Sequence, residues 1–202
     1  MKQVIVIGAG GHGKVIADIV LAAGDHLLGF LDDARAGQQI LGFPVLGGIR
    51  DYVNYKDAEF VIAIGNAQAR EQIASDLEGV RWYTAIHPSA VISPLEVTVG
   101  EGTVIMANAV INPGASVGRH CILNTASVVE HDNRIADFVH ISVGAKLAGV
   151  VSVGKSTWIG VGAVVKNATS ICADCMIGAG AVVVKDILES GTYVGVPARR
   201  IK

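Results

Sequence analysis

Residues 111–153 read INPGASVGRHCILNTASVVEHDNRIADFVHISVGAKLAGVVSV, and an aliphatic residue recurs at every sixth position of this stretch. The period continues without a break on both sides, so that fifteen anchors cover most of the C-terminal half. The anchors are Val99, Ile105, Ile111, Val117, Leu123, Val129, Ile135, Ile141, Leu147, Val153, Ile159, Val165, Ile171, Ile177 and Val183. Neither an α-helix, with a period of 3.6, nor a simple strand, with a period of two, produces this pattern.

Two other positions of the six-residue unit also follow a rule. The residue four places after an anchor is usually small, as at Thr103, Ala109, Ala115, Cys121, Ser127, Ala145, Thr157, Ala163, Thr169, Cys175 and Ala181. The residue directly after an anchor is often glycine or asparagine, as at Gly100, Asn112, Gly118, Asn124, Gly154, Gly160 and Gly178. Glycine and asparagine tolerate the backbone of a tight corner. Each unit therefore predicts one short strand followed by one corner.

The repeat predicts a triangular coil of short parallel strands, with the anchors pointing inward and the small residues packed beside them. Three units complete one coil, so the anchors predict about five full coils, and residues 87–98 a degenerate first one. This hexapeptide rule resembles the left-handed parallel β-helix, whose handedness comes from that resemblance and not from the spacing. We expect this domain to span residues 87–202.

Residues 1–86 predict a different architecture, with the order β-α-β-α-β. Apolar runs at 4–7, 26–31 and 60–64 indicate strands, and helical spacing follows the first and third of them at 12–23 and up to Leu77. Residues 82–86 then lead into His87-Pro88, where the period changes to six. The expected fold is an α/β, Rossmann-like domain followed by the β-helix.

Composition excludes several classes of partner. The net charge of −2 provides no basic field, so nucleic acid is not expected as a partner. The longest uncharged stretch, residues 102–118, is interrupted by Asn108, Asn112 and Pro113, and it does not predict a membrane span. The N-terminus reads as strand and turn rather than as a signal peptide, which favours a cytoplasmic protein.

Neither the cysteines nor the histidines predict a metal site. Cys172 and Cys175 form a C-x-x-C pair without a second pair nearby, and under the repeat they are a corner residue and a small inward residue. His120, His131 and His140 lack the paired spacing of histidine ligands. We therefore predict no bound metal.

A glycine-rich turn links the first predicted strand to the first predicted helix. Residues 8–13, GAGGHG, fit G-x-G-x-x-G, a turn in which backbone N–H groups and a helix N-terminus approach a phosphate. Asp32 and Asp33 follow about twenty residues later, where a carboxylate meets a ribose hydroxyl or a base edge. This part of the chain is roughly half of a complete dinucleotide-binding domain, so a nucleotide diphosphate fits better than NAD. Alternatively, the glycines only allow tight helix-on-strand packing.

Histidines mark the two places where catalysis is expected. His12 stands inside the glycine turn and could reach a substrate, or it could be a solvated residue at a helix start. In the β-helix the small-residue rule fails at Asn133, Val139 and Val151, and the first two failures lie between His131 and His140. His131 lies between Glu130 and Asp132, and a neighbouring carboxylate can orient an imidazole for general-base work. A solvated corner histidine is the alternative.

The motifs in their order resemble a known family. The chain contains, in this order, the motifs GAGGHGK, GFLDD, VIAIGN, IHPSAVISP, NTASVVEHD, HISVGAKLAG and YVGVPARRIK. Together these motifs are similar to those of the sugar O/N-acyltransferases related to sialic-acid O-acetyltransferases. Within that family the chain most resembles bacterial enzymes that N-acetylate a UDP-linked 4-amino-4,6-dideoxy sugar, as in bacillosamine synthesis. The resemblance covers essentially the whole chain and implies acetyl-CoA as co-substrate and a homotrimer with each catalytic site shared between adjacent β-helices.

The resemblance also implies roles for individual residues. It assigns His131 as general base, with Asp132 in the place of the acidic residue that tunes it and Glu130 as the second candidate. The expected nucleotide-sugar site consists of Gly11, His12, Gly13, Asp32, Asp33 and Gly65. The expected acetyl-CoA contacts are His140, Gly149 and Val161. The alternatives within this scaffold are O-acetylation of sialic acid and N-acetylation of a GDP- or dTDP-linked amino sugar, while a binding module without catalysis is the alternative from another class.

Overall fold

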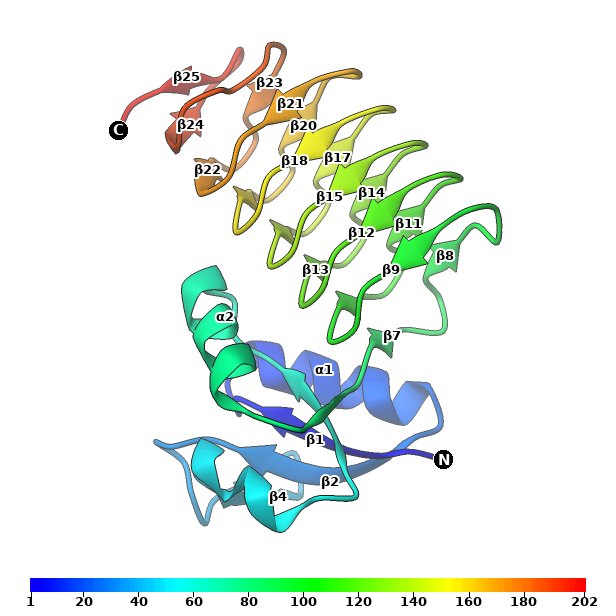
Figure 1. Cartoon of the computed structure of the whole chain (residues 1–202), viewed down its shortest axis with the longest axis vertical. Coiled ribbons are helices and arrows are strands. Elements are labelled where there is room, and N and C mark those ends of the chain that lie inside the picture. Colours follow the sequence, from blue (N-terminus) through cyan, green and yellow to red (C-terminus); the bar gives the residue numbers. More distant parts are fainter.

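The computed structural model describes residues 1–202 and consists of an α/β part followed by a column of stacked coils (Figure 1). The α/β part lies beside the first coils of the column, and the C-terminus lies at the far end. None of the helices has the length and the apolar character needed to cross a lipid bilayer.

The α/β part is built around one six-stranded sheet in the order β3-β4-β2-β1-β5-β6. Its elements are β1 (Gln3–Ile7), α1 (Gly11–Ala22), β2 (His26–Leu31), β3 (Gln39–Ile40), β4 (Phe43–Gly47), the 3-10 helix η1 (Ile49–Asn54), β5 (Glu59–Ile62), α2 (Ala67–Asp76) and β6 (Arg81–Trp82). All neighbours pair in parallel except β3 and β4. The predicted strands and both predicted helices are present, whereas β3, β4 and η1 were not anticipated.

The coils form three parallel sheets, which we name face 1, face 2 and face 3 in the order in which each coil visits them. Face 1 holds β7 (Ala85–Ile86), β10 (Val104–Ile105), β13 (Ile122–Leu123), β16 (His140–Ile141), β19 (Trp158–Ile159), β22 (Cys175–Ile177) and β24 (Gly191–Val194), with β25 (Arg199–Arg200) added antiparallel. Face 2 holds β8 (Val91–Ile92), β11 (Val110–Ile111), β14 (Val128–Val129), β17 (Lys146–Leu147), β20 (Val164–Val165) and β23 (Val182–Val183). Face 3 holds β9 (Thr98–Val99), β12 (Ser116–Val117), β15 (Arg134–Ile135), β18 (Ser152–Val153) and β21 (Ser170–Ile171).

The strand register confirms the predicted repeat. Ile105 pairs with Leu123, Ile111 with Val129 and Val117 with Ile135, so one coil takes three six-residue units. The degenerate first coil is present as β8 and β9, which pair with β11 and β12. A parallel β-helix therefore follows the α/β part, as predicted.

The anchors and the small residues form the core of the column. Every anchor from Ile105 to Val183 is buried in a single cluster, and Val99 packs against its end. The larger Val139 and Val151 are buried in the same cluster, and Asn133 is also fully buried. The Asn133 Oδ1 atom accepts a hydrogen bond of 2.6 Å from the backbone N–H of Val151, one coil further on. The amide oxygen thus bonds along the column, whereas the buried Nδ2 atom has no hydrogen-bond partner in the chain.

The corners differ in one respect from the prediction. The residue directly after an anchor does not carry the unusual backbone; the left-handed φ of about 51° to 72° lies two places later, as at His120 (51°), Asp132 (59°) and Gly114 (72°). Glycine directly after the anchor has another cause. A Cβ at Gly118 would lie 2.6 Å from the backbone nitrogen of Asp137 in the next coil, so that position requires glycine because the coils approach closely.

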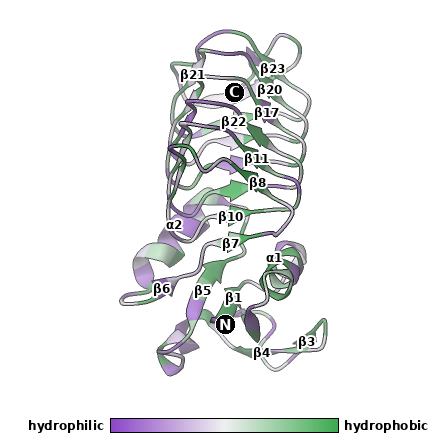
Figure 2. Ribbon diagram, turned by 90° about the vertical axis from the view of Figure 1, so that its right-hand side faces the viewer, coloured by the Kyte–Doolittle hydropathy of each residue, from purple (hydrophilic) through white to green (hydrophobic).

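The chain crosses from one part to the other immediately after β6. β6 pairs with β5 in the α/β sheet, whereas β7 already pairs with β10 of the β-helix, two residues before the predicted boundary. One apolar cluster extends across this junction, from Ile16 and Ile19 of α1 to Val104 and Ile122 of face 1. Figure 2 shows α1 and α2 on either side of the first coils. The α/β part is therefore packed against face 1.

Candidate active site

The Glu130-His131-Asp132 corner follows β14 and lies between faces 2 and 3. The left-handed backbone at Asp132 (φ 59°) turns the chain there. The side chains of His131 and Asp132 are 57% and 62% exposed, so both are open to a ligand. The Nδ1 atom of His131 lies 2.8 Å from Oδ2 of Asp132, and Nε2 has no hydrogen-bond partner in the chain. Asp132 can hold the proton on Nδ1 and leave the lone pair of Nε2 free to accept another.

Two glycines in the neighbouring coils provide the space for this pair. A Cβ at Gly149 would lie 2.3 Å from the Nε2 of His131, and a Cβ at Gly114 would lie 2.5 Å from Oδ1 of Asp132. No side chain fits at these distances, so each glycine admits the polar group stacked against it. Gly149 is therefore a direct neighbour of His131 in the described chain.

Glu130 occupies a different position from Asp132. Its Oε2 atom lies 3.4 Å from the backbone nitrogen of His131, and it makes no contact with the imidazole among the hydrogen bonds of the chain. Of the two predicted carboxylates, Asp132 is the one that orients the ring.

The glycine turn leads from β1 into α1, as predicted, and Gly11, His12 and Gly13 form the first turn of the helix. This segment is very tightly packed. A Cβ at Gly13 would lie 2.1 Å from the carbonyl oxygen of Gly8, so the helix start is held directly against the end of β1. Asp32 accepts hydrogen bonds from the backbone N–H groups of Ala9 (2.8 Å) and Ala34 (3.0 Å). Asp32 thus organises the turn itself, and the packing role of the glycines coexists with any role in binding.

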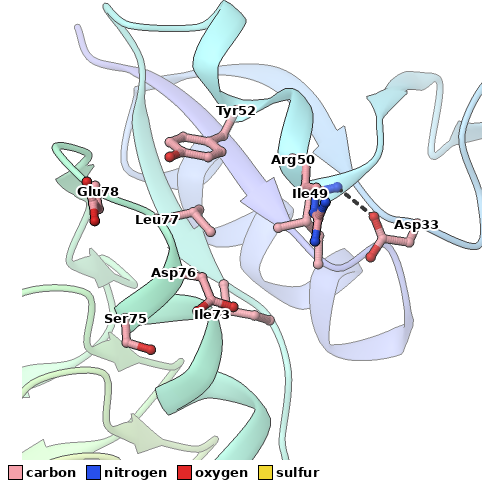
Figure 3. Close-up of a pocket in the computed structure, with 9 residues that line it drawn as sticks. All are labelled: Asp33, Ile49, Arg50, Tyr52, Ile73, Ser75, Asp76, Leu77 and Glu78. Carbon is pink, nitrogen blue, oxygen red and sulfur yellow. Dashed lines mark hydrogen bonds between the residues drawn. The ribbon is translucent and has the colours of Figure 1, made fainter.

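Asp33 opens onto a neighbouring cavity of about 720 Å³. Its Oδ1 accepts a hydrogen bond of 2.8 Å from the backbone of Ile49, which leaves Oδ2 free (Figure 3). Tyr52 and Leu77 form an apolar part of the cavity wall, and Asp76 adds a carboxylate to that of Asp33. The cavity therefore offers apolar contact together with acceptors for hydrogen bonds.

His12 is mostly buried, and its Nε2 has no partner in the chain. Burial first, and then the positive charge of Arg70, lower the pKa of His12 to about 4. At neutral pH this histidine is uncharged, and it is not the solvated residue that the sequence left as an alternative.

His140 lies on the outer surface of face 1 and is only 7% exposed. Its ring stacks on Trp158 with 4.7 Å between centroids, and Nε2 lies 3.2 Å from the side-chain nitrogen of Asn124. Burial, Arg70 and His12 lower the pKa of His140 to about 3. Gly65 faces the same wall, because a Cβ there would lie 4.0 Å from the ring of Trp158. His12, Gly65 and His140 are therefore close together in one chain.

Sequence reasoning missed Asn124, Trp158 and Arg70 as parts of this region. Asn124 and Trp158 occupy ordinary positions of the repeat, and only their outward direction on face 1 brings them beside His140. Arg70 lies in the polar pattern of α2, where an arginine ordinarily indicates a solvated surface. No local signal distinguished these three residues.

The candidate residues fall into two groups on opposite sides of the column. A coil visits faces 1, 2 and 3 in turn, so the corner that carries His131 and Gly149, between faces 2 and 3, is opposite face 1. His140 and the α/β part are at face 1, and Val161, 55% exposed, is at the corner between faces 1 and 2. His131 lines none of the five principal cavities of the single chain. One chain alone does not bring the groups together.

The three histidines considered as metal ligands do not converge. His120 is enclosed between the rings of Trp82 and Phe138, with centroid distances of 4.7 and 5.3 Å. His131 and His140 lie at the separate places described above.

Comparison with known proteins adds independent findings. Residues 3–77 match the family model described as the PglD N-terminal domain. The chain is 33% identical, over 77% of its own length and 74% of the relative, to GDP-perosamine N-acetyltransferase of Escherichia coli O157:H7. It is 42% identical to UDP-N-acetylbacillosamine N-acetyltransferase of Bacillus subtilis (strain 168) over 53% of its own length and 52% of the relative.

One solved structure has a similar fold over nearly the whole length of the chain. The acetyltransferase domain of PglB from Neisseria gonorrhoeae FA1090, in complex with acetyl coenzyme A, is 38% identical and superposes with a TM-score of 0.94 over 99% of each chain. The similarity includes both the α/β part and the β-helix. On this sequence and structural similarity, the chain belongs to the PglD-type family of nucleotide-sugar N-acetyltransferases.

Proposed function

We propose that this protein transfers the acetyl group of acetyl-CoA to the 4-amino group of a nucleotide-linked 4-amino-4,6-dideoxy sugar. The observation that carries the proposal is the His131–Asp132 pair, with Nδ1 held 2.8 Å from a carboxylate and Nε2 free at an exposed corner. Such a pair is suited to remove one proton from a nucleophile as it attacks.

The transfer is direct and needs no acyl-enzyme. The uncharged amine nitrogen attacks the thioester carbon while Nε2 of His131 accepts a proton from that nitrogen. Asp132 stabilises the resulting imidazolium through Nδ1. Hydrogen-bond donors of the site stabilise the oxyanion, with backbone N–H groups or His140 as the candidates. The carbon–sulfur bond then breaks, and the imidazolium returns the proton to the thiolate, giving the amide and free CoA.

The nucleotide sugar binds at the α/β part. Gly11 and Gly13 lie at the start of α1, where backbone N–H groups and the helix dipole favour a diphosphate. His12 lies in the first turn of α1 itself, Asp33 follows β2 and Gly65 follows β5, with Asp32 organising the turn. The neutral His12 can donate or accept a hydrogen bond there without adding charge.

The complete site is shared between copies of the chain in a homotrimer. His131 and the α/β part are on opposite sides of one column, so a second copy must supply the missing group. His131 and Gly149 of one β-helix then face the neighbouring copy's surface with His140, and acetyl-CoA lies between them. Simultaneous binding of both substrates in near-attack geometry supplies much of the rate acceleration.

UDP is the nucleotide we propose first. The matching segment of the chain is 42% identical to the bacillosamine relative, whose name specifies a UDP sugar, and 33% identical to the perosamine relative, whose name specifies a GDP sugar. Asp33 accepts donors from either base and does not distinguish them by itself.

One experiment tests the activity and the acceptor together. Release of the CoA thiol from acetyl-CoA is followed with UDP-, GDP- and dTDP-linked 4-amino sugars, and with free sialic acid. We expect turnover with the UDP-linked amino sugar. Turnover only with sialic acid would reject N-acetylation, and turnover only with the GDP or dTDP sugar would reject the choice of nucleotide. Absence of thiol release with every acceptor would contradict the proposed function.

A further inference from the structure

Arg70 is the largest fully buried side chain of the molecule, with 1% exposure. No carboxylate lies within ion-pair distance of it. Burial lowers the pKa of Arg70 to about 10, so the guanidinium remains charged at neutral pH. A buried cation without an acidic partner is costly unless its N–H groups are well bonded.

The guanidinium is bonded to four backbone carbonyl groups on both sides of the domain junction. Nη1 donates to the carbonyls of Ile64 (2.9 Å) and Gly65 (2.8 Å), in the turn that follows β5. Nε donates to the carbonyl of His120 (3.0 Å), and Nη2 to that of Phe138 (2.5 Å). Arg70 therefore connects the Gly65 turn directly to the β-helix.

The two β-helix partners occupy equivalent corner positions of successive coils. His120 and Phe138 are one coil apart, and both have the left-handed backbone of the corner between faces 3 and 1, with φ of 51° and 61°. Their rings stack on one another with 5.3 Å between centroids. The planar fork of arginine matches this fixed pattern of acceptors, whereas a lysine ammonium has three donors and no fork.

The Gly65 turn lies against face 1, beside Trp158 and His140. Trp158 of face 1 lies against Gly65, and His140 stacks on Trp158. The charge of Arg70 also lowers the pKa of both His12 and His140, which indicates that the guanidinium is close to both groups. The position of the Gly65 turn relative to face 1 thus depends on the bonds that Arg70 makes to either side.

We infer that Arg70 is a positioning residue, which fixes the Gly65 turn at the distance from face 1 that the nucleotide sugar requires. This inference rests on the proposed function, since it assumes that the sugar nucleotide binds at Gly65. Arg70 is buried and does not itself touch substrate. A displacement of about 1 Å at a positioning contact can cost a hundredfold in rate.

The chain contains its own reporters of the junction. It has two tryptophans, Trp82 and Trp158. Trp82 packs edge-on against the ring of His120, whose carbonyl binds Arg70, and Trp158 lies against Gly65. In the Trp82→Phe variant, the tryptophan fluorescence therefore comes from Trp158 alone and reports the surroundings of the Gly65 turn.

The test compares Arg70→Lys and Arg70→Gln with Lys155→Met. Lys155 of the β-helix forms a surface ion pair with Glu71, the residue after Arg70 in α2. Because this ion pair also crosses the junction, Lys155→Met is a matched control. An exposed pair of this kind contributes little to stability. We expect both Arg70 variants to lower kcat/KM for the nucleotide sugar by about ten- to a hundredfold. KM for acetyl-CoA should stay within about twofold, and Lys155→Met should match the wild type in both.

Fluorescence and thermal unfolding are measured on the same proteins in the Trp82→Phe background. We expect the Trp158 emission maximum to shift to longer wavelength in the Arg70 variants and to be unchanged in Lys155→Met, since water enters the junction only in the former. Equal losses for acetyl-CoA and acceptor would show a general structural role and overturn the inference. Unchanged kcat and unchanged KM for the acceptor, together with an unchanged Trp158 emission maximum, would also overturn the inference.

Failure of the proposed function gives a different result. In that case the wild type itself releases no thiol with any acceptor, and the emission comparison still decides whether Arg70 fixes the junction. If one Arg70 variant does not fold, the other gives the kinetic comparison. If neither folds while Lys155→Met does, Arg70 is required for folding as such, and the positioning role is rejected.

Discussion

The Nδ1 atom of His131 lies 2.8 Å from Oδ2 of Asp132, the next residue in the chain. The pair is adjacent in sequence, yet its geometry depends on the corner: the left-handed backbone at Asp132 and the empty space above Gly114 bring the carboxylate to the ring. The free Nε2 then points along the column toward Gly149.

Replacement of His131 by alanine should lower kcat by about 10²- to 10⁴-fold, the range that general-base catalysis supplies. Affinity for acetyl-CoA, measured by calorimetry, should remain within about twofold, because no new charge or bulk is introduced. Undiminished turnover would reject His131 as the base.

The two carboxylates beside His131 should have different effects. Asp132→Asn removes the charge that holds Nδ1–H, and we expect kcat to fall by at least about tenfold. Glu130→Gln is the matched control, since Glu130 lies against the backbone of His131 and not against its ring. Steady-state kinetics of both variants measure which carboxylate assists His131. A larger loss of kcat in Glu130→Gln than in Asp132→Asn would assign this role to Glu130.

Gly149→Ala should displace the catalytic ring without changing its chemistry. The added methyl group would lie 2.3 Å from Nε2 of His131, too close for the ring to stay in place. We expect kcat to fall by about tenfold or more, with little change in the thermal unfolding midpoint because the ring can rotate toward solvent. Asn167→Ala, at the equivalent position of the next coil, serves as the control. Full activity of Gly149→Ala would show that this ring position is not used.

Gly13→Ala should destabilise the α/β part. Its Cβ would lie 2.1 Å from the carbonyl oxygen of Gly8, and backbone atoms cannot move away as a flexible side chain can. We expect a loss of about 1–3 kcal/mol in the free energy of unfolding, the range for overpacking. Gly10→Ala, where a Cβ meets nothing within 4 Å, should unfold at the wild-type midpoint. Equal midpoints for the two variants would contradict the packing argument.

The buried histidines make stability depend on pH. The pKa is about 4 for His12 and about 3 for His140 in the folded chain, against 6.5 for an ordinary histidine. Above pH 6.5 both states are neutral, and below it only the unfolded chain binds protons, so stability falls as the pH decreases toward 4. The slope is up to about 1.4 kcal/mol per pH unit for each histidine.

Urea unfolding between pH 7 and pH 4.5 measures this slope. His140→Gln should reduce it, because one proton fewer is taken up on unfolding. His26→Gln is the control, because His26 is exposed at the start of β2. A slope unchanged by His140→Gln would mean that His140 is charged in the folded protein.

Much of the fold could be predicted because the repeat is a local rule with a geometric consequence. Anchors at every sixth position are buried together when three units form one coil, and the cluster from Ile105 to Val183 has that arrangement. The short strands β3 and β4 could not be predicted in this way, since they lie outside the repeat and Pro44 interrupts the apolar residues of β4. β4 pairs with the edge that β2 offers, and β3 pairs with β4.

The candidate site was predictable only in part, and for the same reason. The sequence by itself determined the order of strands, the corner that carries His131 and Asp132, and the glycine turn before α1, because each depends on neighbours within a few residues. Tertiary structure decided that His140 stacks on Trp158, that Arg70 binds the carbonyls of His120 and Phe138 across the junction, and that His131 is opposite face 1. These relationships join residues that are tens of positions apart, and they arise only when the coils stack and the two parts of the chain pack together.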